Sequence, residues 1–317
     1  KFEVSGPGAL GLLQRVACNN VNRPVGSLVY TQFLNAHGGI ESDLTVCRLA
    51  GDRFRVITGT SFLSNDLEWV RSHAPAGGSV EIRDVTDDLA CIGLWGPDAR
   101  DVLDQATGDD LSNGAFPYLT ARKLTVAGKP AWVQRVSYIG ELGWELYLAN
   151  DDAGAVWDTL LELGQAHGIR PAGYKALDSL RLEKGYVYWS IDVTPEDNLL
   201  EAGLGFCADM AKGDFIGHDA LAKRKEEGLQ TRLRTVVLEG NTLPAYGAES
   251  VWHDGEIVSR LRSAGHAHTI DRSIAYCYLP LVLAKPGVEV EIELFGERVP
   301  ATVSLPIHDP KGTRLKA

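Results

Sequence analysis

The stretch Ser137–Asn150, SYIGELGWELYLAN, holds the alternation that decides the fold of the region around it. Trp144, Leu146 and Leu148 fall on one face of an extended chain, and Glu145 falls on the other. A period of two residues is the pattern of a β-strand with one buried face. The stretch therefore predicts a strand, and it places a carboxylate on the second face of the most apolar strand in the sequence.

Glu145 allows two interpretations. Many strand glutamates simply face solvent. This one is framed by bulky apolar and aromatic residues, and an unpaired buried carboxylate costs on the order of several kcal/mol. A ligand with two adjacent N–H donors would satisfy both oxygens, and pterin and guanine rings present a ring N–H beside an amino group. Glu145 is therefore a candidate ligand-binding residue.

The neighbouring segments extend the pattern into an α+β body. Residues 123–150 predict two or three strands, with turns at Gly128–Lys129 and Gly140–Glu141. Residues 53–59 predict another strand, and residues 88–106 predict a strand followed by a helix. Further helices are predicted within segments 6–18, 60–75, 151–168 and 174–185. Helices and strands thus alternate through the first part of the chain.

The pattern changes after about Gly228. From Thr231 onward nearly every segment alternates with period two, broken by turn signals such as Asp254–Gly255 and Phe295–Gly296. Such a series predicts an antiparallel barrel or sandwich. The expected organisation is an α+β body over residues 1–228 and a β-rich domain over residues 229–317.

Composition and charge limit the possible function classes. The 317 residues carry a net charge of -11, which argues against nucleic-acid binding because phosphate contacts need clustered Lys and Arg. No apolar run approaches the length of a membrane span, so no membrane partner is expected. The chain begins at Lys1–Phe2, without Met or a signal peptide and inside an expected strand. This start predicts a body that is N-terminally incomplete.

Cysteine and histidine usage points away from a metal site. The five cysteines are scattered and form no CxxC pair, which favours free thiols, packed as small core residues, in a reducing, cytoplasmic compartment. His266 and His268 alternate in an expected strand, but their motif contains no carboxylate or Cys. No metal site is therefore expected.

Two further stretches carry candidate groups. Asp43, in NAHGGIESDLTV, is either a strand-edge aspartate or a semi-buried carboxylate that takes a proton or stabilises a cation. In LDSLRLEKGYVYW, Asp178, Arg181 and Glu183 are expected on an ordinary charged helix face, with Glu183 and Lys184 solvated. The aromatic residues within 186–189 either line a pocket for a planar ligand or belong to the core.

Seven sequence motifs occur in the same order as in a known protein family. They are VSGPGALGLLQRVACNNV, NAHGGIESDLTV, YIGELGWELYL, LDSLRLEKGY, EAGLGFCADMAKGDFIG, RSIAYCYLP and DPKGTRLKA. Together they resemble the aminomethyltransferase (glycine cleavage T-protein) family. GELGWELY and SLRLEKGY are typical of the branch that contains the tetrahydrofolate domains of dimethylglycine oxidase, dimethylglycine dehydrogenase and sarcosine dehydrogenase. The resemblance implies a folate-binding body of interleaved ferredoxin-like subdomains, followed by a C-terminal antiparallel β-barrel.

The resemblance also implies roles for particular residues. Glu145 matches the glutamate that grips the pterin edge of tetrahydrofolate. Asp43 matches the aspartate placed beside the folate nitrogens where the one-carbon unit arrives, and it is the implied catalytic residue. The other implied cofactor-binding residues are Tyr30, Tyr138, Tyr186 and Arg314.

The implied activity is transfer of a one-carbon unit from a flavoprotein N-demethylase of N-methyl amino acids, giving methylene-tetrahydrofolate. The sequence contains no flavin-binding fingerprint, so FAD is expected only on a missing domain or a separate chain. Leu177 stands where the T-protein usually has arginine, which argues against glycine cleavage with a lipoyl carrier. Two alternatives stay open: a stand-alone tetrahydrofolate-dependent O- or S-demethylase, and a non-catalytic folate-binding scaffold.

Overall fold

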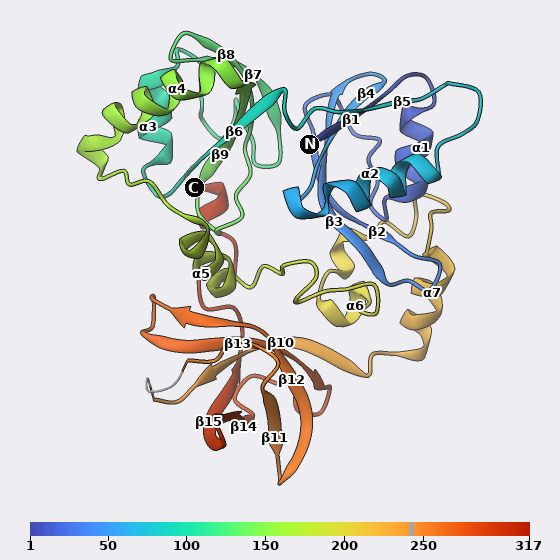
Figure 1. Cartoon of the computed structure of the whole chain (residues 1–317), viewed down its shortest axis with the longest axis vertical. Helices are drawn as coiled ribbons and strands as arrows, with labels where there is room; N and C mark the ends of the chain where they lie inside the picture. Colours follow the sequence, from blue (N-terminus) through green and yellow to red (C-terminus); the bar gives the residue numbers. More distant parts are fainter. Residues whose placement is uncertain (241–243) are drawn as a thin grey trace.

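The computed structural model describes residues 1–240 and 244–317. Figure 1 shows three lobes: two sheets with their helices form the upper half, and a barrel forms the lower end. Helices α5 (Tyr174–Lys184) and α6 (Leu199–Ala202) lie between the sheets and the barrel. The C-terminal segment returns from the barrel to the side of α5, so both termini lie in the upper half.

The first lobe is an antiparallel sheet with the strand order β2-β3-β4-β1-β5. Its strands are β1 (Phe2–Ser5), β2 (Leu28–Leu34), β3 (Ile40–Ala50), β4 (Arg53–Ile57) and β5 (Glu81–Asp84). Helices α1 (Ala9–Val16) and α2 (Leu63–Ser72) pack on one face of this sheet, and a 3₁₀ turn, η1 (Thr60–Phe62), precedes α2. The helices predicted within 6–18 and 60–75 and the strand predicted at 53–59 are confirmed.

The second lobe is a four-stranded antiparallel sheet with the order β6-β9-β8-β7. Its strands are β6 (Leu89–Trp95), β7 (Ala121–Val126), β8 (Lys129–Gln134) and β9 (Gly143–Ala149). Helices α3 (Ala99–Ala106) and α4 (Asn150–Leu163) cover one face, and a 3₁₀ turn, η2 (Gly164–His167), follows α4. The predicted turn at Gly128 joins β7 to β8, with left-handed φ angles of 51° at Ala127 and 75° at Gly128.

Strand β9 shows the alternation that its sequence predicts. Trp144, Leu146 and Leu148 are buried in the core beneath α3 and α4, and each such side chain contributes about 1.5–3 kcal/mol of apolar burial. Glu145 lies on the opposite, helix-free face. The strand is thus fixed in register by its apolar side, and that register decides where the carboxylate points.

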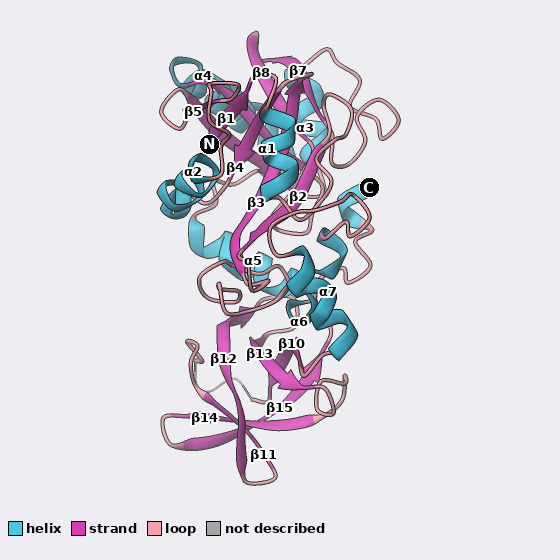
Figure 2. Ribbon diagram, turned by 90° about the vertical axis from the view of Figure 1, so that its right-hand side faces the viewer, coloured by secondary structure: helices cyan, strands magenta, loops and turns pink. Residues whose placement is uncertain are grey.

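The segment between the second sheet and the barrel contains four short helices, and Figure 2 shows α5 and α6 above the barrel. Besides α5 and α6 they are η3 (Gly205–Cys207) and α7 (His218–Glu227). Helix α5 ends, as predicted, at Gly185, whose φ of 83° is left-handed.

The predicted solvated face of α5 holds for Asp178, whose side chain is 58% exposed, and is wrong for the other three residues. Arg181, Glu183 and Lys184 are all buried, because the barrel and the C-terminal segment cover the end of the helix. Arg181 Nη1 lies 2.6 Å from Asp192 Oδ2, and Lys184 Nζ donates to the carbonyl oxygen of Asp309 at 2.6 Å. The cations of Arg181 and Lys184 are thus paired with aspartates inside the fold.

The third lobe is a closed antiparallel barrel with the order β10-β13-β12-β11-β14-β15. Its strands are β10 (Thr231–Leu238), β11 (Ser250–His253), β12 (Glu256–Ala267), β13 (Arg272–Pro280), β14 (Glu289–Leu294) and β15 (Glu297–Ser304), and a 3₁₀ turn, η4 (Arg314–Lys316), ends the chain. The hairpin turns fall at Asp254–Gly255 and Phe295–Gly296, where all four φ angles are positive.

The predicted fold class is confirmed: an α+β body is followed by a barrel, and closure of the sheet excludes the sandwich. Helix α7 ends at Glu227 and β10 begins at Thr231. The division of the chain into domains 1–228 and 229–317 falls between these two elements and stays a prediction.

Candidate functional site

The two sheets approach each other through their helix-free faces, called here the inner faces. Leu28 and Cys47 of the first sheet and Ala121 of the second form one buried cluster. The indole N–H of Trp132 donates to Cys47 Sγ at 3.3 Å. Residues that share these faces are Tyr30, Gln32 and Asp43 in the first sheet, and Gln134, Glu145 and Tyr147 in the second. The fold therefore turns both candidate carboxylates, Asp43 and Glu145, towards the junction of the sheets.

Asp43 is held by two neighbours on its own sheet. Gln32 lies directly opposite it on β2, and Gln32 Nε2 donates to Asp43 Oδ1 at 2.7 Å. The hydroxyl of Tyr30, one inward position away, also hydrogen-bonds the carboxylate. Gln32 is fully buried, so it restricts the rotation of the aspartate.

Burial changes the acidity of these groups. It raises the pKa of the Asp43 carboxyl to about 6, against the opposing effect of the hydrogen bonds from Tyr30 and Gln32, and the charge of Asp66 adds to the rise. Burial and the adjacent Asp43 raise the pKa of Tyr30 well above its usual value, so its hydroxyl stays protonated. An acid with a pKa close to neutral can exchange a proton under working conditions.

Replacing Asp43 by asparagine is expected to stabilise the fold at pH 8 by up to about 3 kcal/mol, from the rise of the carboxyl pKa to about 6. The folded-state pKa is raised, so the ionised aspartate destabilises the fold above about pH 6. That penalty fades as the pH falls through 6 towards the unfolded value. Urea unfolding at pH 8 and pH 4 measures the difference, which should shrink at the lower pH. An asparagine variant less stable than the wild type at pH 8 would contradict the inferred burial penalty.

Glu145 has a different environment. Its Oε2 accepts a hydrogen bond of 2.6 Å from the hydroxyl of Tyr147, two positions along the same face of β9. Burial raises the pKa of the Glu145 carboxyl, and the bond from Tyr147 opposes that rise. The guanidinium of Arg55, on the first sheet, lies 5.8 Å from the centre of the Tyr147 ring. Glu145 is therefore a half-buried carboxylate close to the contact between the two inner faces.

Tyr138 and Tyr186 come together between β8, β9 and the end of α5. Their rings are stacked, with centroids 6.0 Å apart and planes 23° from parallel. The Tyr138 hydroxyl donates to the carbonyl oxygen of Val187 at 2.6 Å. Burial raises the pKa of Tyr138, Arg181 opposes the rise and Asp43 adds to it, which places Tyr138 within electrostatic reach of Asp43. The predicted residues Tyr30, Asp43, Tyr138 and Tyr186 thus form one neighbourhood.

Arg314 forms an ion pair with a glutamate of the loop between β8 and β9. Its Nη1 lies 2.7 Å from Glu141 Oε1, and its side chain is 53% exposed. His308 Nε2 contacts the same oxygen at 2.9 Å. The guanidinium thus pairs with Glu141, whose side chain is only 12% exposed, rather than with Asp43 or Glu145. A cofactor-binding role for Arg314 stays a prediction.

Two inner-face residues were not singled out from the sequence. Gln134 is fully buried and lies directly opposite Glu145 on β8. The ring of Trp95 lies across two glycines, and a Cβ atom added at Gly93 would come within 2.5 Å of it. The glycines of CIGLWG and ELGWEL, which alternate with large residues, were the available signal for this close packing.

Within residues 1–240 and 244–317, no group of three or more His, Cys, Asp or Glu side chains is placed to hold a metal ion. All five cysteines are free thiols, and Cys91, unlike the other four, is exposed rather than part of the core. No helix in the described part of the chain has the length and apolar character needed to cross a bilayer.

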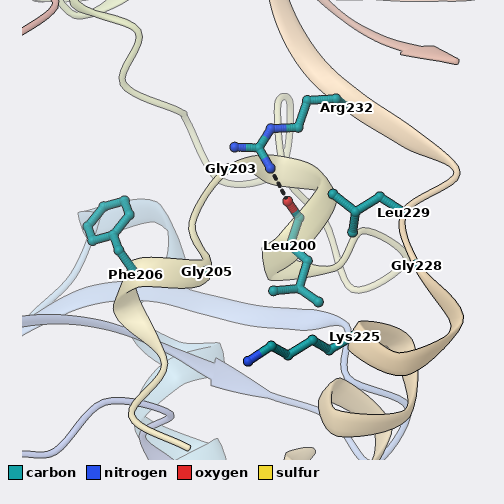
Figure 3. A pocket seen from close by; sticks show the side chains of 8 residues that line it. All are labelled: Leu200, Gly203, Gly205, Phe206, Lys225, Gly228, Leu229 and Arg232. Carbon is teal, nitrogen blue, oxygen red and sulfur yellow. Dashed lines mark hydrogen bonds between the residues drawn. The ribbon is translucent and has the colours of Figure 1, made fainter. Parts of the chain in front are cut away.

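A hollow beside α6 is separate from these groups. Figure 3 shows its eight lining residues, which include the apolar side chains of Leu200, Phe206 and Leu229 and the cations Lys225 and Arg232. Its volume is about 430 Å³, and Arg232 Nη1 donates to the carbonyl oxygen of Leu200 at 2.9 Å. The six predicted site residues are not among its lining residues, so it adds nothing to the carboxylate site.

The arrangement has a close counterpart among solved structures. A crystal structure of the glycine cleavage system aminomethyltransferase T from Bartonella henselae superposes with a TM-score of 0.86 over 98% of this chain and 84% of that chain, at 25% identity. The body, the barrel and their order define an aminomethyltransferase-like protein.

The sequence comparisons are more specific. The profile described as GCVT N-terminal domain matches residues 1–212, and the profile described as glycine cleavage T-protein C-terminal barrel domain matches residues 232–308. The chain belongs to the glycine cleavage T-protein (aminomethyltransferase) family. An aminomethyltransferase of Halothermothrix orenii is 36% identical over 91% of this chain and 80% of its own length.

A second kind of relative is much longer. Human mitochondrial dimethylglycine dehydrogenase is 36% identical over 321 residues, covering 100% of this chain but only 37% of that protein. The chain thus spans little more than a third of the length of the dehydrogenases it matches. The predicted family is confirmed, together with its likeness to the dehydrogenase branch.

Proposed function

We propose that this chain is a tetrahydrofolate-dependent one-carbon transferase module serving a flavoprotein N-demethylase of N-methyl amino acids. The observation that carries the proposal is Asp43: a half-buried carboxylate with a pKa of about 6, held by Tyr30 and Gln32 at the junction of the two sheets. Transfer of a cationic one-carbon unit to an amine needs a group that stabilises positive charge and then accepts a proton. Asp43 has both properties.

The residues at the junction fit a reduced folate. Glu145 offers an ionisable carboxylate on a face of the second sheet, and Tyr147 occupies only one of its oxygens. A pterin ring, with a ring N–H beside an amino group, would satisfy that carboxylate with two charge-assisted hydrogen bonds. Tyr138 and Tyr186 supply stacked aromatic surface near Asp43.

Tetrahydrofolate, when bound, supplies the amine nitrogen that receives the one-carbon unit. Asp43, ionised above about pH 6, stabilises the positively charged donor and takes the released proton on a carboxylate oxygen. Gln32 and Tyr30 hold that carboxylate in one orientation through their hydrogen bonds. The enclosing inner faces limit the access of water, which would otherwise hydrolyse a labile one-carbon donor.

The donor and the flavin are inferred from the longer relatives. Human dimethylglycine dehydrogenase matches this chain over only 37% of its own length, which leaves most of that protein for the oxidation that its name states. We propose that FAD is bound by a further domain or by a separate chain. The small molecule that donates the one-carbon unit is an N-methyl amino acid. The cytoplasmic location stays a prediction from cysteine usage.

The proposal is tested by binding and by capture of one-carbon units. In isothermal titration, folinic acid, a stable reduced folate, is expected to bind the chain at one site. With tetrahydrofolate and a dimethylglycine dehydrogenase that lacks its own folate domain, adding the chain should convert released formaldehyde into methylene-tetrahydrofolate. Bovine serum albumin at the same concentration controls for nonspecific effects. No folinic acid binding, or an unchanged formaldehyde yield, would exclude the function; capture from an O- or S-methyl donor instead would favour a demethylase.

A further inference from the structure

The inner face of the second sheet carries a row of four residues that cross all four strands. The pairing register places Ala121 opposite Gln134, Gln134 opposite Glu145, and Glu145 opposite Gly93. Two polar side chains thus stand side by side in the middle, and the two ends of the row carry the smallest side chains. Directly opposed residues bring their Cβ atoms within about 4.5–5.5 Å, so the amide and the carboxylate are neighbours.

Gln134 is unusual within this row. Its side chain is 0% exposed, and neither Oε1 nor Nε2 has a hydrogen-bond partner in the described part of the chain. The adjacent carboxylate is instead engaged by the hydroxyl of Tyr147 at 2.6 Å. Buried amides without hydrogen-bond partners are rare in folded proteins. Such an amide loses its hydrogen bonds to water on folding and gains none in return, which costs free energy.

Structural packing does not account for a glutamine at this position. The other face of β8 buries Ala131 and Val133 in the core, so apolar side chains are readily placed along this strand. An apolar residue of similar length at 134 would avoid the cost of an unpaired amide. A polar group kept without a partner beside a ligand-binding carboxylate indicates that the partner is a ligand.

We infer that Gln134 is a second recognition residue for the folate ring, acting beside Glu145. This inference rests on the proposed function. The edge of a reduced pterin presents an amino group, a ring N–H and a carbonyl oxygen in sequence, which is a donor–donor–acceptor pattern. The carboxylate of Glu145 accepts from the two donors, and Gln134 Nε2 donates to the carbonyl oxygen. Bound folate then supplies the hydrogen bond that the protein itself leaves unmade.

One substitution at Gln134 is therefore expected to weaken folate binding without lowering the stability of the fold. Gln134→Met keeps the length of the side chain and removes its unpaired polar atoms. The variant is expected to keep or raise its melting temperature while binding folinic acid at least about tenfold more weakly. A purely structural glutamine would give the reverse: a lower melting temperature with unchanged affinity. The matched control is Gln165→Met, at an exposed glutamine in η2, which should change neither quantity.

A second variant tests the donor directly. Gln134→Glu removes the N–H at neutral pH, so folinic acid binding should weaken at pH 7.5. Protonation of the new carboxyl at pH 5 restores a donor, and the affinity relative to the wild type at the same pH should then recover. Titration calorimetry and thermal unfolding measure both variants. If wild-type protein does not bind folinic acid, the proposed function fails; if it binds and Gln134→Met binds within about twofold of it, only the role of Gln134 is overturned.

Discussion

The Asp43→Asn variant is expected to form methylene-tetrahydrofolate about 10²–10⁴ times more slowly than the wild type, the usual contribution of a positioned general base. Asparagine keeps the size of the side chain and can still accept the hydrogen bond from Gln32 Nε2, which is 2.7 Å long in the wild type. It carries no charge and cannot take up the proton. Folinic acid affinity should stay within about threefold, because Asp43 acts on the transferred unit and not on the ring edge.

The measurement is single-turnover capture of one-carbon units at saturating tetrahydrofolate, from pH 5 to pH 8. The wild-type rate should rise with pH through about 6, where Asp43 loses its proton, and that step should vanish in the variant. The matched control is Asp52→Asn, at an exposed aspartate of the same lobe, which should behave as wild type. An Asp43→Asn variant with wild-type turnover would remove Asp43 from the chemistry. A proportional loss of folate binding would instead make it a binding residue.

The Glu145→Gln variant is expected to bind folinic acid about 10- to 100-fold more weakly, which corresponds to loss of a charged hydrogen bond from a buried site. The amide oxygen can accept a hydrogen bond from one of the two ring donors. The amide nitrogen is itself a donor, so it cannot accept a hydrogen bond from the other. Tyr147, whose hydroxyl now donates to Glu145 Oε2 at 2.6 Å, can still donate to the amide oxygen. The fold should therefore survive the substitution.

Glu162→Gln, the same change at an exposed position of α4, is the matched control and should leave affinity unchanged. Calorimetric titration measures the affinity, and circular dichroism checks that each variant is folded. Restoring tight binding by lowering the pH is not expected for Glu145→Gln, because the amide does not titrate. Equal affinity of this variant and the wild type would remove Glu145 from the ring site, whatever the fate of Asp43.

Local sequence patterns predicted much of the fold, because short-range geometry decides those features. The alternation around Glu145 fixed a strand and its apolar face, and Trp144, Leu146 and Leu148 are indeed buried together. Asp254–Gly255 and Phe295–Gly296 predicted tight hairpins, since left-handed φ angles favour such residue pairs, and both turns have them.

The same local reasoning failed where distant segments cover a surface. Arg181 and Lys184 lie on a helix whose sequence predicts a charged, solvated face. In the folded protein they form salt bridges with Asp192 and Asp309. The spacing of residues along α5 does not predict that the barrel and the C-terminal segment pack against this helix. Gln134 was missed for the same reason, because its importance lies in having no partner in the folded chain.

The sequence by itself determined the strands, the helices and the hairpins, since each depends on residues that are close together in the chain. The order of its motifs determined the family. Only the tertiary structure decided that Asp43 and Glu145, about a hundred positions apart in the chain, lie on two sheet faces that meet. It also decided the acidity of Asp43, because a pKa depends on burial and on neighbours such as Gln32, Tyr30 and Asp66. Burial and long-range contacts arise only when the lobes pack together, and no local pattern encodes their outcome.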